Sequence, residues 1–182
     1  MAPQPEQKAR EEIDRLLSAA GWHVCDADKA NIHAARGVAI REFPLPGYGF
    51  ADYLLYVEGK AAGVIEAKKE GVTLTGVETQ SDKYTKGLPA GLPRWGNPLP
   101  FSYQSTGAET RFTNGLDPQP RSRPVFAFYK PDLLAEWLAY LPSLARGRGA
   151  GGEGAFTAAP PYATFLSPRA PEEPALSQLS VA

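Results

Sequence analysis

The spacing of apolar residues predicts a helix at the start of the chain. Within residues 5–20, Ile13, Leu16, Leu17 and Ala20 recur at helical intervals, and Glu11, Glu12, Asp14 and Arg15 lie off this stripe. Gly21 follows the last apolar position and ends the predicted helix. Residues 22–43 mix a short apolar piece with small and polar residues, so we expect irregular structure with one or two short turns.

The next apolar runs predict a β-hairpin. Residues 48–57 are rich in aromatic and aliphatic side chains, and residues 62–68 form a second apolar run that contains one acid and one lysine. The segment Glu58-Gly59-Lys60 between them is typical of a tight turn. Two antiparallel strands joined by this turn are therefore expected.

The second half of the chain has weaker patterns. Residues 75–87 have helical character, and several prolines then prevent a long helix. Residues 101–105 and 123–129 look like strands separated by a turn-rich segment, and the latter is apolar on both faces, as in an interior strand. A last helix is predicted over residues 133–141.

Composition divides the chain into a domain and a tail. The 182 residues include 18 glycines and 18 prolines, which are concentrated after residue 86. We expect one domain over residues 1–144 and a flexible or disordered tail over 145–182, where glycine, proline, serine and alanine dominate.

Charge and cysteine content restrict the classes of function. A net charge of −1 means that nucleic acid cannot be held by a global basic field, so any contact must come from local patches. The single cysteine excludes an intrachain disulfide and a cysteine-based zinc cage. No apolar run approaches the length of a membrane span. A soluble, cytoplasmic protein with no membrane partner is expected.

The predicted hairpin carries the candidate chemistry. In a strand, Glu66 and Lys68 project from one face, because alternate residues share a face. Asp52 lies on the preceding strand, and antiparallel pairing can bring its carboxylate close to that of Glu66. The two carboxylates would repel each other unless a cation lay between them, and oxygen ligands of this kind select Mg²⁺ or Mn²⁺ over zinc.

This set of residues suits cleavage of a phosphodiester. A divalent ion that keeps water ligands supplies a Lewis acid and a source of hydroxide, and Lys68 can orient the water and balance charge on the phosphate. A hairpin with a solvated charged face would also give alternating Glu and Lys. Asp52 argues against that reading, because it interrupts an otherwise apolar strand in which an unpaired charge is costly.

An ordered series of motifs resembles the PD-(D/E)xK nuclease superfamily, in the version found at the N-terminus of type I restriction endonuclease R subunits. In that family an aspartate is followed by a turn and then by E-A-K, and a Q-x-x-x-Y element lies downstream on a helix. The matching residues here are Asp52, Glu66-Ala67-Lys68 and Gln80 to Tyr84. Further matches cover Ile13 to Trp22, Glu109 to Asn114 and Asp117 to Arg123, within a span of roughly residues 8 to 142.

The resemblance implies an α/β, α+β-like fold with a central mixed sheet flanked by helices. It implies a magnesium-dependent endonuclease that cuts double-stranded DNA and assembles with modification and specificity subunits. By the same analogy, Asp52 and Glu66 bind the metal, Lys68 is catalytic, and Gln80 and Tyr84 contact the substrate strand; a polar residue capping a core tyrosine is an alternative reading of that last pair. The chain has no G-x-x-x-x-G-K-[ST] phosphate loop, so no ATP site is expected and the chain reads as a subunit truncated before its ATP-driven translocase.

Two other functions stay open at this point. The chain can be a catalytically silent DNA-binding or docking module, or a stand-alone repair-type nuclease of the same superfamily. Glu12, on the first helix, is a candidate for a distant metal contact, with a solvated helix face as the default reading.

Overall fold

The computed structural model describes residues 5–74 and 81–141. The chain divides into two compact units, Met1–Ala139 and Tyr140–Ala182, and the helices and strands named below belong to the first. The predicted domain boundary at residue 144, the tail over 145–182 and the first part of the predicted helix at 75–87 lie outside the described residues.

The first unit is built on a mixed seven-stranded sheet whose strands are ordered as they occur in the chain. Parallel pairing joins β1 to β2 and β4 to β5, and the other neighbours are antiparallel. The strands are β1 (His23–Asp26), β2 (Gly37–Leu45), β3 (Gly49–Val57), β4 (Lys60–Ala67), β5 (Phe101–Ser105), β6 (Thr110–Asn114) and β7 (Arg123–Val125).

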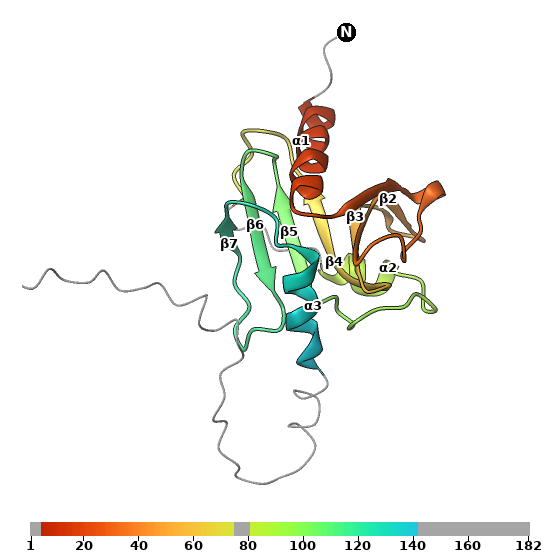
Figure 1. The fold of residues 1–182 in the computed structure, drawn as a ribbon. Coiled ribbons are helices and arrows are strands. Elements are labelled where there is room, and N and C mark those ends of the chain that lie inside the picture. The colour runs from red at the N-terminus through yellow and green to blue at the C-terminus, as the bar shows by residue number, and fades with distance from the viewer. Residues whose placement is uncertain (1–4, 75–80, 142–182) are drawn as a thin grey trace, which may run out of the picture. The chain divides into compact units, whose positions relative to one another are not determined.

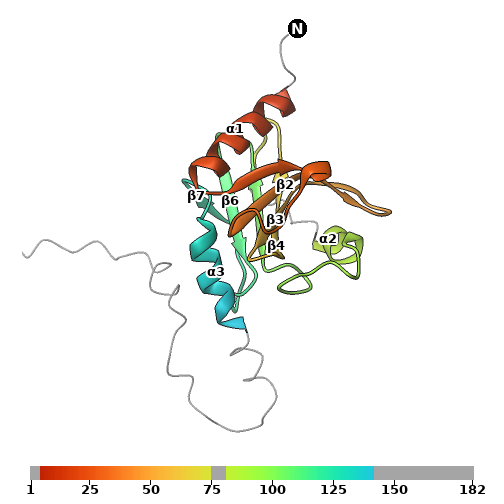
Figure 2. The same ribbon diagram turned by 45° about the vertical axis from the view of Figure 1, so that its right-hand side comes forward.

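Helices cover both faces of this sheet. Helices α1 (Pro5–Ala19) and α3 (Pro131–Ala139) lie on one face, and the short helix α2 (Ser81–Gly87) lies on the other (Figures 1 and 2). A single 3₁₀ turn, η1 (Ala27–Lys29), follows β1. The expected mixed sheet flanked by helices is therefore confirmed.

Strands β3 and β4 form the predicted hairpin. Their tight turn is made by Glu58 and Gly59, with φ angles of 51° and 74°. Positive φ angles at both central residues are characteristic of the type I′ turn, which matches the twist of the two flanking strands. Glycine adopts this left-handed region without strain. The register of the hairpin shifts once, between Leu55 and Tyr56.

Two apolar cores hold the helices on the sheet. On the face that carries α1, Ile13 and Leu17 are fully buried, which confirms the helical stripe predicted from sequence. An aromatic cluster anchors α3 on the same face, where the rings of Phe112 and Trp137 lie 6.1 Å apart. On the opposite face, α2 packs on a cluster made by Val38, Ile40, Leu45, Leu54, Tyr56, Val64, Tyr84 and Leu88.

Several sequence predictions of elements are wrong. Residues 22–43 are not irregular, since they contain β1 and most of β2; the first four residues of β2 are buried on both faces and so show no alternation. Strand β6 lies in the segment predicted to be turn-rich, with no strand. The predicted interior strand at 123–129 is instead the three-residue edge strand β7, after which Phe126 is fully exposed.

Candidate functional site

The hairpin register places the two predicted acids on neighbouring strands at the same level. Tyr53 pairs with Ile65 in the antiparallel β3–β4 ladder, so the next residues outward, Asp52 and Glu66, stand opposite each other. Opposite residues project to the same side of a sheet. Glu66 also pairs with Gln104 of the parallel neighbour β5, which continues the row of polar side chains by one strand.

Asp52 is held by two donors. Its Oδ1 accepts a hydrogen bond of 2.9 Å from Nη2 of Arg10, which α1 brings to this end of β3. Its Oδ2 accepts a bond of 3.0 Å from the backbone N–H of Ala67, so the carboxylate also ties β3 to the end of β4. With 27% of the side chain exposed, Asp52 is accessible to solvent.

Glu66 is the buried acid of the pair, with only 4% of the residue exposed. The Tyr84 hydroxyl donates to its Oε1 at 3.2 Å. Its Oε2 lies 3.4 Å from Nζ of Lys68 and accepts no hydrogen bond within the described part of the chain. A buried carboxylate oxygen without a hydrogen bond is costly, because the lost hydration is not replaced.

Lys68 lies directly after β4, where the sheet ends. Its backbone N–H donates to the carbonyl of Ser105 at 2.8 Å, which extends the β4–β5 pairing and fixes the lysine beside the acids. The side chain is half-buried and ends at Glu66, in the ion pair described above. Lys68 thus combines a fixed backbone with an amine that solvent can still reach.

Tyr84 of α2 closes the site from the side of the sheet opposite to α1. Burial, together with the negative charges of Glu66 and Asp52, raises the pKa of its phenol far above the usual value. The phenol therefore stays protonated and remains a hydrogen-bond donor to Glu66 at any physiological pH. Tyr84 thus contacts Glu66 directly from the α2 side of the sheet.

The structure thus brings together four of the five predicted site residues, and the fifth, Gln80, lies outside the described residues. Glu12 forms an ion pair with Arg15 of its own helix. That arrangement fits the default reading of a solvated helix face.

The site offers two carboxylates to a divalent cation, but no third acidic, histidine or cysteine ligand within the described ranges of the chain. Two carboxylates at one level of the sheet and the Glu66 oxygen without a hydrogen bond are oxygen donors of the type that Mg²⁺ prefers. Among the described residues no group of three or more His, Cys, Asp or Glu side chains could hold a metal. Mg²⁺ keeps several water ligands and binds through one or two carboxylates, so two acids are sufficient.

Sequence reasoning missed two charged residues here, Arg10 and Glu42. Arg10 bridges Asp52 and Glu42. Its Nη1 binds Oε1 of Glu42 at 2.5 Å, and its Nη2 binds Oδ1 of Asp52. Glu42 lies on β2, between the residues that pair with Ala51 and Tyr53. No local motif marks either residue, and their roles appear only when α1, β2 and β3 are placed side by side.

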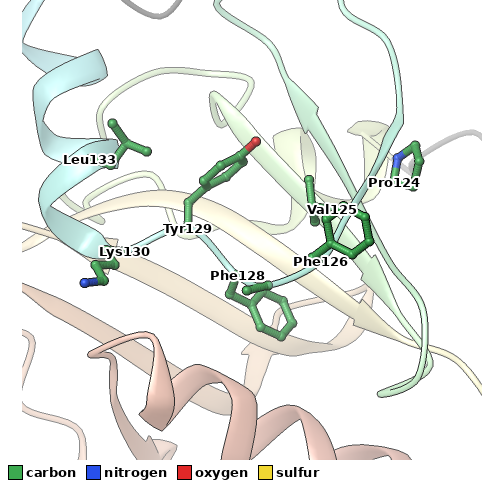
Figure 3. Close-up of a pocket in the computed structure, with 8 residues that line it drawn as sticks. Pro124, Val125, Phe126, Phe128, Tyr129, Lys130 and Leu133 are labelled. Atoms are coloured by element: carbon green, nitrogen blue, oxygen red, sulfur yellow. The ribbon is translucent and has the colours of Figure 1, made fainter. Parts of the chain in front are cut away.

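A separate pocket lies at the start of α3. It has a volume of about 430 Å³ and is formed by the segment that links β7 to α3 (Figure 3). Its lining residues are Pro124, Val125, Phe126, Ala127, Phe128, Tyr129, Lys130 and Leu133. None of them belongs to the carboxylate site, and an apolar lining with one lysine offers no set of groups for catalysis.

Comparisons with known proteins point to restriction enzymes. Residues 19–95 match the family model described as "Type I restriction enzyme EcoKI endonuclease subunit second domain". A relative from Escherichia coli (strain K12), the type I restriction enzyme EcoKI endonuclease subunit, is 31% identical over 102 residues. No solved structure matches the chain.

The family model matches the segment that contains the hairpin and its acids, whereas the match to the E. coli subunit covers a small share of that protein. It takes in 49% of this chain and 8% of the length of the E. coli subunit. In the part of the chain that the structure describes, no helix has the length and apolar character needed to cross a bilayer. Residues 19–95 are thus similar to the second domain of the endonuclease subunit of a type I restriction enzyme.

Proposed function

We propose that this chain is a magnesium-dependent DNA endonuclease domain of a type I restriction system. The observation that carries the proposal is the placement of Asp52 and Glu66 at one level of the β3–β4 hairpin, with Lys68 at 3.4 Å from a buried Glu66 oxygen. The PD-(D/E)xK-like order of these residues and the similarity to a type I restriction subunit support it.

Each residue has a distinct part in this proposal. Asp52 and Glu66 hold Mg²⁺ or Mn²⁺, which when bound supplies a Lewis acid for the phosphate and an acidified water. Lys68 orients the attacking water and balances the negative charge that develops on the phosphate. Tyr84 fixes Glu66 through its hydrogen bond, and Gln80 would join it in supporting the substrate strand.

The substrate and partners are proposed from the similarity to the type I restriction subunit. Double-stranded DNA is the proposed substrate, and the modification and specificity subunits of a type I complex are the proposed partners, in the cytoplasm. Because the net charge of the chain is −1, we expect binding to DNA by the isolated chain to be weak and sensitive to salt.

A second candidate function is that of a catalytically silent docking or DNA-binding module. The ion pair between Arg10 and Asp52 favours it, because a cation supplied by the protein already neutralises the acid. In that case the acids are structural and bind no divalent ion. The two candidates differ in a property that can be measured on the chain itself, its affinity for Mn²⁺.

Calorimetric titration with Mn²⁺ tests the metal site. We expect one binding event in the wild-type chain that disappears in Asp52→Asn, which keeps the shape of the side chain and removes its charge. Glu12→Gln is the matched control, since Glu12 is an exposed acid paired with Arg15, and it should leave binding unchanged. Absence of binding in the wild-type chain would favour the silent module, and binding that survived in Asp52→Asn would contradict the role of Asp52 as a metal ligand.

Replacement of Lys68 tests catalysis. Lys68→Ala should lower Mn²⁺-dependent nicking of supercoiled plasmid by about 100-fold or more, the usual effect of losing a residue that acts on the attacking group. Lys69→Ala removes the same charge from the adjacent, exposed position and should keep the wild-type rate. Nicking by Lys68→Ala at full rate would contradict the proposed role.

A further inference from the structure

Arg10 is fixed between two acids at the edge of the candidate site. Its guanidinium donates from Nη2 to Asp52 at 2.9 Å and from Nη1 to Glu42 at 2.5 Å. The attraction of Asp52 and Glu42 outweighs the effect of burial, which alone would lower the pKa of Arg10, so the net pKa is raised. Arg10 is therefore a permanent positive charge in contact with a proposed metal ligand.

The backbone of β2 supports this arrangement. Glu42 has a φ angle of 47°, in the left-handed region that residues other than glycine seldom adopt. The strand pairs on both sides of it are regular, with Arg41 opposite Tyr53 and Phe43 opposite Ala51. This backbone conformation costs energy, and within this stretch of β2 only Glu42, the residue that binds Arg10, adopts it. We infer that the surrounding contacts hold Glu42 in place.

Each proposed metal ligand already has a positively charged partner. Arg10 pairs with Asp52, which it shares with Glu42, and Lys68 pairs with Glu66. A divalent cation that approaches both acids would meet these two cations, and Nη2 of Arg10 already occupies Oδ1 of Asp52. Coordination through that oxygen requires Arg10 to move away.

We propose that Arg10 and a divalent cation compete for the Asp52 carboxylate, with Glu42 retaining the arginine when the cation displaces it. Arg10 is thus a positioning residue that holds the site in order without metal and sets how tightly metal binds. This inference rests on the proposed function, because it takes Asp52 to be a metal ligand.

Calorimetric titration of Arg10→Met with Mn²⁺, without DNA, tests the competition. Methionine keeps an unbranched apolar side chain and removes the charge, so we expect the dissociation constant for Mn²⁺ to fall by about tenfold, equivalent to about 1.4 kcal/mol. Arg15→Met is the matched control, because Arg15 lies on the same helix and pairs with Glu12 away from the site. It should change the constant by less than about twofold.

The possible results separate this inference from the proposed function. Unchanged or weaker binding in Arg10→Met, with binding still lost in Asp52→Asn, overturns the competition and leaves the metal site standing. Absence of binding in both the wild type and Arg10→Met overturns the competition and the metal site together. Binding that appears only in Arg10→Met supports the competition. If Arg10→Met does not fold, Arg10→Lys serves instead, with a smaller gain expected because one amine cannot bridge both acids.

Discussion

At the scale of single residues, Glu66 is a buried acid whose hydrogen bonding is incomplete among the described residues. Its carboxylate is almost wholly buried and receives one hydrogen bond, from Tyr84, and one ion pair, from Lys68. Burial of an acid with an oxygen that accepts no hydrogen bond in the described residues costs free energy that an apolar residue would not. Such a cost is common where a side chain serves function and not stability.

Tyr84→Phe tests the support of Glu66. Loss of the hydroxyl leaves the second carboxylate oxygen without a donor, so the free energy of unfolding should fall by about 1–3 kcal/mol in urea melts at pH 7. Tyr56→Phe is the control, because Tyr56 lies buried in the same apolar cluster and its hydroxyl forms no hydrogen bond with the described residues. Equal stability of the two variants would contradict the role given to Tyr84.

Residue types and spacing were sufficient to predict Asp52, Glu66 and Lys68 as neighbours, because the two-residue period of a strand and one tight turn fix their relation. Arg10 could not be predicted in this way. It is separated from Asp52 by 42 residues, and contact depends on how α1 crosses the sheet. Long-range contacts of this kind are set by packing of whole elements, which a local pattern does not contain.

At the scale of elements, the close approach of β4 and β5 fixes the level at which Glu66 stands beside Gln104. Glycine at position 63 permits it, because a Cβ atom there would lie 2.7 Å from the carbonyl oxygen of Phe101 and 2.9 Å from its Cβ. Gly63 pairs with Phe101 three residues before Glu66 pairs with Gln104. A shift of β4 at Gly63 would thus be carried along the strand to the acids.

Gly63→Ala should therefore destabilise the sheet. Overpacking against backbone atoms that cannot rotate away costs about 1–3 kcal/mol, and we expect a loss of that size in the free energy of unfolding. Gly91→Ala provides the control, since a Cβ atom there meets nothing within 4 Å and its φ angle is not in the left-handed region. Equal unfolding midpoints for the two variants would show that β4 and β5 can separate without cost.

Prediction of elements succeeded where one signal dominated. The helical stripe of α1 and the two apolar runs of the hairpin were recognised, because each has a single periodicity and a clear end. Strand β1 was missed since its four residues are all at least partly exposed, and β6 was missed since turn residues flank a segment of only five. Both need their neighbours in the sheet to form, and that pairing is not visible in a short window of sequence.

At the scale of the whole first unit, buried tyrosines on both faces of the sheet make the free energy of unfolding depend on pH under alkaline conditions. Tyr53 and Tyr103 lie on the face of α1 and α3, where Tyr53 donates to Asp14 and Tyr103 accepts from the backbone of Tyr129. Tyr56 and Tyr84 lie on the face of α2. Burial raises the pKa of all four phenols, that of Tyr56 to about 12 and the others further.

The sign of the resulting pH dependence follows from proton binding. In the unfolded chain each phenol loses its proton near pH 10, whereas in the folded chain it keeps the proton to a higher pH. Above pH 10 the unfolded state binds fewer protons than the folded state, so the free energy of unfolding falls as pH rises. Each of these tyrosines adds at most about 1.4 kcal/mol per pH unit to that fall, and below pH 10 none does.

We therefore expect stability to be nearly level from pH 8 to about 9.5 and to fall steeply from pH 10 to 12, with buried phenols ionising only as the chain unfolds. Urea melts across this range, with tyrosinate absorbance at 295 nm recorded in parallel, measure both events. Tyr56→Phe should make the fall less steep, since it removes one of the shifted groups. Complete ionisation of all 8 tyrosines near pH 10 in a chain that keeps its fold would contradict the burial of Tyr53, Tyr56, Tyr84 and Tyr103.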